Sequence, residues 1–453
     1  MLDWTDAQKQ AFQSGTQKYL TLTFSGGTVI DNELIQAESM SLTQTICDEQ
    51  ELKYGLCYAS MFSVVVFVVD EVFEGQTVTV QLQADSYTMN LGTYLVVSCP
   101  LSDDRTYRTI TAYDALYNIL QNNYAPWIGE TFDFPITMGQ FRNAFFNHIG
   151  ITQVSAILVN DNTQVLMIPS NDVISGADIL RSIGEINGVF GHINYDGHFK
   201  WVGISVNDES LYPALTIYPR NNGTLIPTEA SYYTVTDGDY AVGTLVYGEG
   251  LVDSPTKVSY TGTSGATYSY GTDGVEYQLS SNILLTASTT NIVTTALSNL
   301  YTNIAGISYV PATVKLRAAP WVEVGDSVLI VSRFNDEVRF PVMNRTMNGI
   351  TGLMDGFSAY GTGKYTNNPN SAAEKRNQAL TYSYLAQFSV SITPSNMVFG
   401  NTNTCTLTAK VFHSGIELTN LSGFQIVWSD GVLGQTRTGV PINATYTATL
   451  ERV

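Results

Sequence analysis

Short apolar or alternating runs, separated by turn-forming glycine, asparagine and aspartate, recur along most of this 453-residue chain. In the first hundred residues they fall at Tyr19–Phe24, Ser60–Val69, Thr77–Asp85 and Thr93–Ser98, with Gly26-Gly27 as a turn. Runs of this length and spacing predict β-strands. The chain is therefore expected to be mainly β, and residues 1–104 to form a small barrel or sandwich.

The composition favours a folded chain that does not bind DNA. Charged residues make up 13% of the sequence, about half the roughly 25% of typical soluble domains, and hydrophobic residues make up 44%. That apolar content can offset chain entropy, which argues against disorder. Because 21 Lys and Arg face 40 Asp and Glu, the net charge of −19 opposes sequence-independent binding to phosphate backbones.

Targeting and redox signals are few. The longest apolar run, Met61–Val69, is about half the ~20 residues of a membrane-spanning helix, so it predicts a buried strand. The first residues lack the basic and apolar regions of a secretion signal, and we expect assembly in a bacterial cytoplasm. The cysteines are too far apart for a CxxC site and are interpreted as buried thiols: Cys47, Cys57, Cys99 and Cys405.

A helical period replaces the alternation after residue 105. Over Thr109–Gln121 one stripe of a helix would be apolar, formed by Ala112, Ala115, Leu116, Ile119 and Leu120. A second helix is predicted after Thr137, whose spacing to Gln140 is that of a capping box, with Gly150 as its end.

A third helix and a hairpin complete this region. Ser175 is a suitable N-cap and Gly188 a suitable terminator for a helix between them. Asp196-Gly197, between Phe190–Tyr195 and His198–Val202, predicts a hairpin with a type I′ turn. Residues 105–208 are therefore expected to form an α+β domain.

Short strand-like runs separated by turn residues return over residues 209–363 and predict a second β-barrel-like domain. One helix interrupts it, with apolar residues at helical spacing from Ile292 to Ile304 and Gly306 after them. Two strand pairs are expected next: Thr313–Arg317 with Ser327–Ser332, then Phe340–Asn344 with Ser358–Tyr360.

The last part of the chain changes character twice. Residues 364–387 are polar and predict a linker with a short helix. Residues 388–453 alternate as in an immunoglobulin-like β-sandwich, with strands at Ser389–Thr393, Cys405–Val411, Gln425–Trp428 and Thr445–Leu450 and with Trp428 as the core aromatic. Without the paired cysteines of antibody domains, this module resembles bacterial Ig-like modules.

Candidate catalytic groups are scarce. His192 and His198 flank the predicted hairpin turn and could approach as two metal ligands, but no third ligand has a diagnostic spacing, so we expect solvated hairpin residues. His148 would lie at a helix C-terminus, where a cation suits the helix dipole. The fourth histidine is His413. Asp237-Gly238-Asp239 lacks the rest of a calcium loop and predicts a turn.

Sequence motifs of common enzymes are missing: GxSxG, a Walker loop, HExxH, and a GxGxxG that opens a helix after a strand. We predict that the protein is not an enzyme, that it has no catalytic, cofactor-binding or metal-binding residues, and that it needs no cofactor. A pair of carboxylates could still come together in the fold, which keeps a hydrolase open as an alternative.

Several motifs occur in a particular order. A Ser-rich segment at residues 38–42 precedes Ile46–Gly55, which contains acidic residues, Leu52, Tyr54 and Gly55. Further motifs are Thr111–Leu116 (TAYDAL), Phe134-Pro135, Gly150-Ile151, Gly176–Trp201 with its YDGHFKW hairpin, Ala318–Asp326 and Arg345–Gly361. As an ordered set over about residues 20–363, they resemble tail hub proteins of tailed bacteriophages and phage-like particles.

This resemblance implies a structural virion protein of the tail tip or baseplate. It implies a homotrimer whose two tail-tube-like β-domains per subunit form a pseudo-sixfold ring that closes a hexameric tube and lines or gates the DNA channel. The implied partners are tail tube or distal tail protein, tape measure protein and other tail-tip or fibre proteins. DNA would pass without specific binding, since an acidic wall does not hold phosphates. The Ig-like module could contact the host envelope.

Two alternative functions remain open. A bacterial surface adhesin or glycan-binding protein would also suit the Ig-like end, although the missing secretion signal counts against it. A cell-wall hydrolase with a dispersed carboxylate pair is disfavoured by the scarcity of candidate groups.

Overall fold

The protein is described from a computed structural model. The described residues are 4–47, 51–169, 173–204, 215–217, 240, 244–247, 251–262, 265–279, 282–317, 319–331, 337–361, 388–394, 404–413, 416–418, 421, 424–441 and 446–452. The linker predicted at 364–387 and the turns predicted at 237–239 and 248–250 lie outside these residues.

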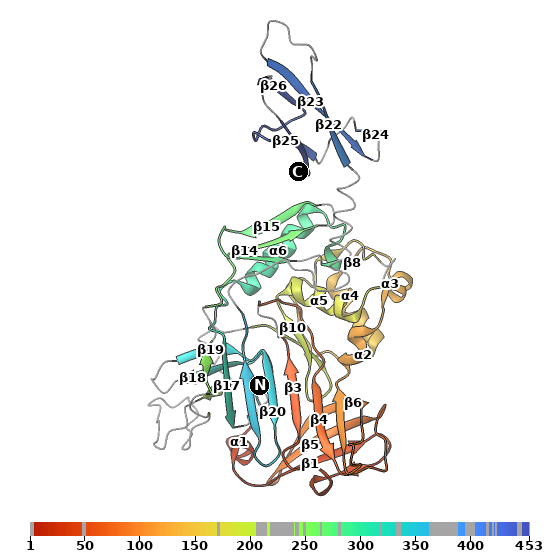
Figure 1. Cartoon of the computed structure of the whole chain (residues 1–453), viewed down its shortest axis with the longest axis vertical. Coiled ribbons are helices and arrows are strands. Elements are labelled where there is room, and N and C mark those ends of the chain that lie inside the picture. Colours follow the sequence, from red (N-terminus) through yellow and green to blue (C-terminus); the bar gives the residue numbers. More distant parts are fainter. Residues whose placement is uncertain are drawn as a thin grey trace.

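The largest sheet has 11 antiparallel strands and runs across the lower half of Figure 1. Its order is β13 (Val246–Tyr247), β17 (Ala312–Arg317), β21 (Met354–Ser358), β20 (Asn344–Asn348), β3 (Ser41–Thr45), β4 (Met61–Val66), β7 (Arg108–Tyr113), β6 (Tyr87–Ser98), β5 (Thr77–Ala84), β1 (Lys18–Phe24) and β2 (Val29–Ile30). The chain is mainly β, as the sequence predicts.

The N-terminal strands curl into a barrel. The 3-10 turn η1 (Asn32–Leu34) follows β2. Directly after it, Ile35 forms an antiparallel bridge with Val66 at the end of β4, so the segment after β1 and β2 also contacts β4. Alternate side chains of these strands point inward, because side-chain direction alternates along a strand. They form one core, which includes Leu20, Leu22, Phe62, Val64, Val78, Val80 and Ile110. Helix α1 (Asp6–Gln13) packs Ala11 and Phe12 on this core.

A second β unit continues from the barrel through the pairing of β3 with β20, in which Thr43 faces Thr346. Beside β17, β21 and β20 lies a sheet of β12 (Leu215–Ile217), β18 (Ser327–Val331) and β19 (Glu337–Pro341). Two β units with nearly 300 residues between their joining strands therefore share one sheet. The sequence does not reveal this pairing.

The strand pairs predicted in this unit are wrong. β17 pairs with β21, and β18 pairs with β19 and β12, so Thr313–Arg317 and Ser327–Ser332 are not partners. The segment between them is not a tight turn, because Trp321, Val322 and Val324 are buried in the core. The last two predicted strands are also displaced: residues 340–344 span the end of β19 and the start of β20, and β21 ends at Ser358.

The helices lie mainly at one end of the strands (Figure 1). They are α2 (Leu116–Gln121), α3 (Ala125–Thr131), α4 (Met138–Ile149), α5 (Gly176–Asn187) and α6 (Thr290–Ile304), with η2 (Ile283–Leu285) beside them. Capping boxes at Thr137 and Ser175 and left-handed C-caps at Gly150 and Gly188 confirm the predicted ends of α4 and α5. The helix predicted from Ile292 is also confirmed as α6.

The helix predicted over Thr109–Gln121 is wrong in its first half. β7 continues to Tyr113, where Ile110 and Ala112 point into the barrel core, and α2 begins only at Leu116. The Asp114 carboxylate makes this change of direction, because it accepts hydrogen bonds from the backbone N–H groups of Ser60 and Leu116, both at 2.9 Å. Residues 108–113 thus belong to the sheet of the preceding strands.

Helix α5 is the centre of the helical layer. All its residues except Ala177 are buried, including Asp178, Arg181 and Glu185. It approaches the loop before β4 so closely that a Cβ on Gly184 would lie 2.6 Å from the Gly55 Cα. Only glycines allow these two backbones to meet.

The hairpin that follows α5 is confirmed, but its turn type is not. β10 (Phe190–Ile193) pairs with β11 (Phe199–Val202), and the Asn194 N–H donates to the His198 carbonyl at 2.9 Å. The Gly197 N–H donates to the Asn194 carbonyl, and Gly197 has φ 79° while Asp196 is not among the positive-φ residues. This is a three-residue loop with a left-handed glycine, not a type I′ turn, which needs positive φ at both central residues.

The other described elements are small. A sheet of β14 (Lys257–Thr261), β15 (Thr267–Gly271) and β16 (Glu276–Leu279) packs against α6, and β8 (Ile136–Thr137) pairs with β9 (Gln164–Val165). The C-terminal part has β22 (Phe388–Pro394), β23 (Thr404–His413), β24 (Ile416–Glu417) and β26 (Thr436–Pro441) in one sheet and β25 (Phe424–Trp428) with β27 (Ala448–Arg452) in another. Trp428 is 1% exposed in the small core between them. The immunoglobulin-like assignment and the domain boundaries stay predictions.

Candidate functional site

The two hairpin histidines do not form a site. The strand register places Lys200 opposite His192, and His198 is exposed just before the start of β11. His192 is 2% exposed, so the expectation of a solvated residue is wrong for it, and burial lowers its pKa to about 4. In the part of the chain that the structure describes, no three His, Cys, Asp or Glu side chains gather as metal ligands.

The remaining sequence candidates have packing roles. The His148 ring stacks on Trp127 at 4.6 Å in the last turn of α4. Cys47 and Cys99 are buried as expected, whereas Cys57 and Cys405 are half-buried. Desolvation raises the pKa of Cys57 to about 12, which leaves little thiolate at neutral pH. Within the described ranges, no helix is long and apolar enough to span a membrane.

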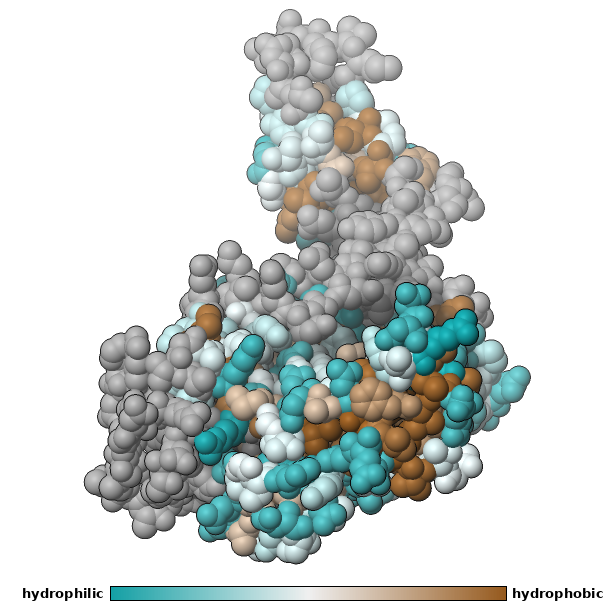
Figure 2. All heavy atoms as spheres, turned by 60° about the horizontal axis from the view of Figure 1, so that its bottom comes forward, coloured by the Kyte–Doolittle hydropathy of each residue, from teal (hydrophilic) through white to brown (hydrophobic). Residues whose placement is uncertain are grey.

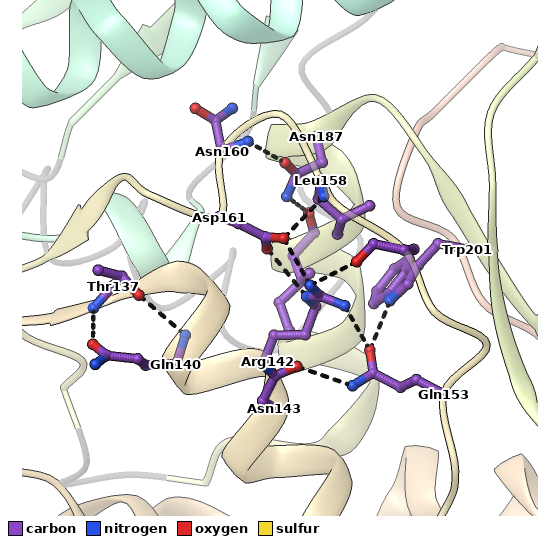
Figure 3. Close-up of polar contacts among 12 residues, drawn as sticks. Thr137, Gln140, Arg142, Asn143, Gln153, Leu158, Asn160, Asp161, Asn187 and Trp201 are labelled. Carbon is purple, nitrogen blue, oxygen red and sulfur yellow. Dashed lines mark hydrogen bonds and ion pairs between the residues drawn. The ribbon is translucent and has the colours of Figure 1, made fainter.

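An ordered polar cluster surrounds Arg142 on α4 (Figure 3). The guanidinium donates through Nε and Nη2 to Asp161, at 3.2 and 2.7 Å, through Nη1 to Gln153 Oε1 at 2.8 Å, and through Nη2 to the Ala156 carbonyl at 3.2 Å. Asp161 also accepts from the Leu158 N–H. Arg142 is 5% exposed, and the Asp161 carboxylate neutralises its buried charge.

Gln153 connects this cluster to the hairpin. Its Oε1 also accepts from the indole N–H of Trp201 at 3.2 Å, and its Nε2 donates to Asn143 Oδ1 at 3.3 Å. The loop after α4 is thereby held against the helix, and between them lies a groove of about 580 Å³. Within the described chain, the polar side chains that line it without a partner of their own are those of Asn147, Thr152 and Ser155. Sequence reasoning missed this groove.

One end of the barrel exposes apolar side chains. Val29 is 58% exposed, Leu34 42%, Phe67 45% and Val72 59%. They are neighbours in the fold, since the Phe67 N–H donates to the Leu34 carbonyl and the Thr28 hydroxyl donates to Glu71. We call these four residues the barrel-end patch. Figure 2, which turns this end of the molecule forward, shows a hydrophobic area on that face.

The exposed charged residues beside the barrel-end patch are acidic, while the half-buried Arg108 guanidinium donates to the Val69 carbonyl between Phe67 and Val72. Asp31, Glu33, Asp70 and Glu74 are exposed beside it, and the segments 25–36 and 67–76 contain no Lys or Arg. Monomeric proteins rarely leave large contiguous apolar areas open to water, so such a patch with a polar rim marks an interaction surface.

The edge strand β13 of the 11-stranded sheet is also apolar, and both basic side chains and the exposed Asp253 lie near it. On β13, Val246 is 60% and Tyr247 45% exposed, and Leu251 just after it is 48% exposed. We call these three residues the β13 patch. The adjacent strand β17 carries exposed Lys315 and half-exposed Arg317, and Lys315 exchanges backbone hydrogen bonds with the Thr244 hydroxyl before β13.

No family model and no curated protein matches the chain. Solved structures of three tail proteins, two of them described as prophage proteins, are similar to the chain. A tail protein from Neisseria meningitidis has 12% identity and a TM-score of 0.44, and the match covers 76% of this chain and 96% of that one. A 43 kDa tail protein of prophage MuSo2 from Shewanella oneidensis has 10% identity and a TM-score of 0.46, with coverage of 76% and 98%. A prophage tail protein from Listeria monocytogenes has 12% identity and a TM-score of 0.44, with coverage of 81% and 100%.

Proposed function

We propose that this chain is a non-enzymatic structural protein of a phage or phage-like tail, and that it forms a trimeric ring at the tail tip that closes the hexameric tube. One observation carries the proposal: the chain exposes two unlike apolar patches, the barrel-end patch with exposed acidic residues around it and the β13 patch on an edge strand beside Lys315 and Arg317. The ordered motifs in the sequence support the same role.

Two different patches favour a head-to-tail contact between copies of the chain. A contact between unlike surfaces generates a closed ring when the rotation between copies allows it. Burial of Phe67, Val72, Val246 and Tyr247 would supply the apolar core of the contact, and Lys315 facing Asp31 or Asp70 would set its direction. A contact of the barrel-end patch with itself would instead place acidic rims against each other.

The two β units of each chain explain how a trimer could match a sixfold tube. The pairing of β3 with β20 holds the units side by side in one sheet, so three chains would present six such units around the ring. With a net charge of −19, the inner wall of the ring would repel DNA phosphates and let the genome pass. Tail tube, distal tail, tape measure and fibre proteins are the proposed neighbours.

A complementation experiment tests the head-to-tail contact. Phe67→Lys places a charge in the barrel-end patch, and Val246→Glu does the same in the β13 patch. Because burying an unpaired charge in an apolar contact is costly, each variant alone should be monomeric by light scattering. In an equimolar mixture, the intact β13 patch of Phe67→Lys can bind the intact barrel-end patch of Val246→Glu. The mixture should therefore form a heterodimer and no ring.

Val173→Lys is the matched control, because Val173 is 59% exposed outside both patches and its substitution should leave the trimer unchanged. Wild-type mass in the Phe67→Lys and Val246→Glu variants, or a mixture that stays monomeric, would contradict the proposal.

A further inference from the structure

We propose that the groove between α4 and residues 150–156 binds an uncharged oligosaccharide. This inference is independent of the proposed ring, because neither patch contributes to the groove. The volume of about 580 Å³ lies within the roughly 300–1,000 Å³ of small-molecule sites.

The charge of the groove excludes ionic ligands. Among the described residues that line it, Arg142 is the only charged one, and four hydrogen bonds to Asp161, Gln153 and Ala156 engage four of the five N–H groups of its guanidinium. An anion would meet no free cation, and it would also face the negative end of the α4 dipole at Gly150. A cation would meet no carboxylate among the lining residues.

The free polar groups suit hydroxyl-rich ligands. The Asn147 amide offers both donors and an acceptor, and the Thr152 and Ser155 hydroxyls can each donate or accept. All three side chains are exposed. Sugar hydroxyls likewise act as donor and acceptor at the same oxygen, so these groups can pair with them in several ways. Ile151 and Val154 add apolar surface for the C–H faces of a sugar ring.

The wall of the groove is fixed before a ligand arrives. Gln153 is held by Arg142, Trp201 and Asn143, and Arg142 is held by Asp161 (Figure 3). Such preorganisation reduces the ordering cost of binding. An extended peptide is the less suitable ligand, because the Val154 N–H and the Thr152 carbonyl already bond to Phe199 and the loop offers no free strand edge at these positions.

The test uses the full chain with chitotetraose and maltotetraose as probes, followed by saturation-transfer NMR and calorimetry. At least one of the two sugars should bind. Asn147→Ala should weaken that binding about three- to tenfold, the loss expected for one hydrogen bond. Asn147→Trp should fill the groove and abolish it. Asn118→Trp is the matched control, since Asn118 is an exposed helical asparagine on α2 outside the groove.

Each result bears on the proposal directly. Melting temperatures of the three variants equal to that of the wild type would show that the fold is kept. Lack of binding by both sugars, equal loss with Asn118→Trp, or binding of the uncharged peptide acetyl-Thr-Gln-Ser-Thr-Asn-amide at the same site in place of the sugars would overturn it. The oligomeric state does not enter any of these readouts, so failure here leaves the ring proposal standing.

Discussion

Removal of the Asp355 carboxylate should be the most destabilising single change among the ion pairs described here. Arg345 on β20 and Asp355 on β21 are both 1% exposed, and they form two hydrogen bonds of 3.0 and 2.9 Å. The guanidinium also donates to the Tyr195 hydroxyl and to the carbonyls of Ala319 and Val322. Asp355→Ala would leave this cation buried without its counter-charge, and loss of one partner of a buried pair costs about 3–5 kcal/mol.

The assay is urea unfolding followed by tryptophan fluorescence. Asp273→Ala is the control, because Asp273 pairs with Lys257 at 3.4 Å but its side chain is 99% exposed, and exposed pairs contribute little. A double variant, Arg345→Met with Asp355→Val, should recover part of the loss, since apolar residues of roughly similar volume remove the uncompensated charge. A loss below about 1 kcal/mol for Asp355→Ala, or no recovery in the double variant, would refute this reasoning.

Three further substitutions test the packing and the buried titratable groups. Gly184→Ala should destabilise the fold by about 1–3 kcal/mol in urea unfolding despite its better helix propensity, because its Cβ would meet the backbone of Gly55 and Val189; Gly15→Ala, with open space around it, should not. The pKa of His192 falls from 6.5 to about 4 on folding, so between these values the unfolded chain takes up a proton that the native state refuses. The contribution of His192 to stability should therefore decrease as pH falls from about 6.5 to 4, and His192→Gln, beside Glu323 and Lys200, should remove that contribution in a pH series of unfolding curves. Burial raises the pKa of Asp114 to about 6, so its contribution has the opposite sign: it should decrease as pH rises from about 4 to 6, and Asp114→Asn should remove it when the variant is compared with wild type over the same range.

Local signals in the sequence were sufficient for much of the helical layer. The ends of α4 and α5 follow from Thr137 with Gln140 and from Ser175 with Gly188, because a cap needs only residues within one turn. The failure at residues 109–113 has a physical cause. Ile110 and Ala112 fit both a helical stripe and an alternating strand, and only the pairing of β7 with β4 decides between them.

The pairing of strands that are distant in sequence, and the groove beside α4, could not be predicted from the sequence. Nothing near Thr43 indicates that it faces Thr346, and no local pattern places β18 beside β12 and β19. Arg142, Gln153 and Asp161 are single polar residues without diagnostic spacing, and only the fold brings them into one cluster beside the groove. The two patches could not be predicted for the same reason, since the exposure of Phe67 and Val246 depends on how strands distant in sequence pair.

The oligomeric state of the purified chain tests the central claim most directly. Light scattering combined with negative-stain images should give three times the 49.5 kDa chain mass and ring-shaped particles. A mass of one chain at every accessible concentration, in the presence as well as the absence of tail tube protein, would contradict the head-to-tail ring.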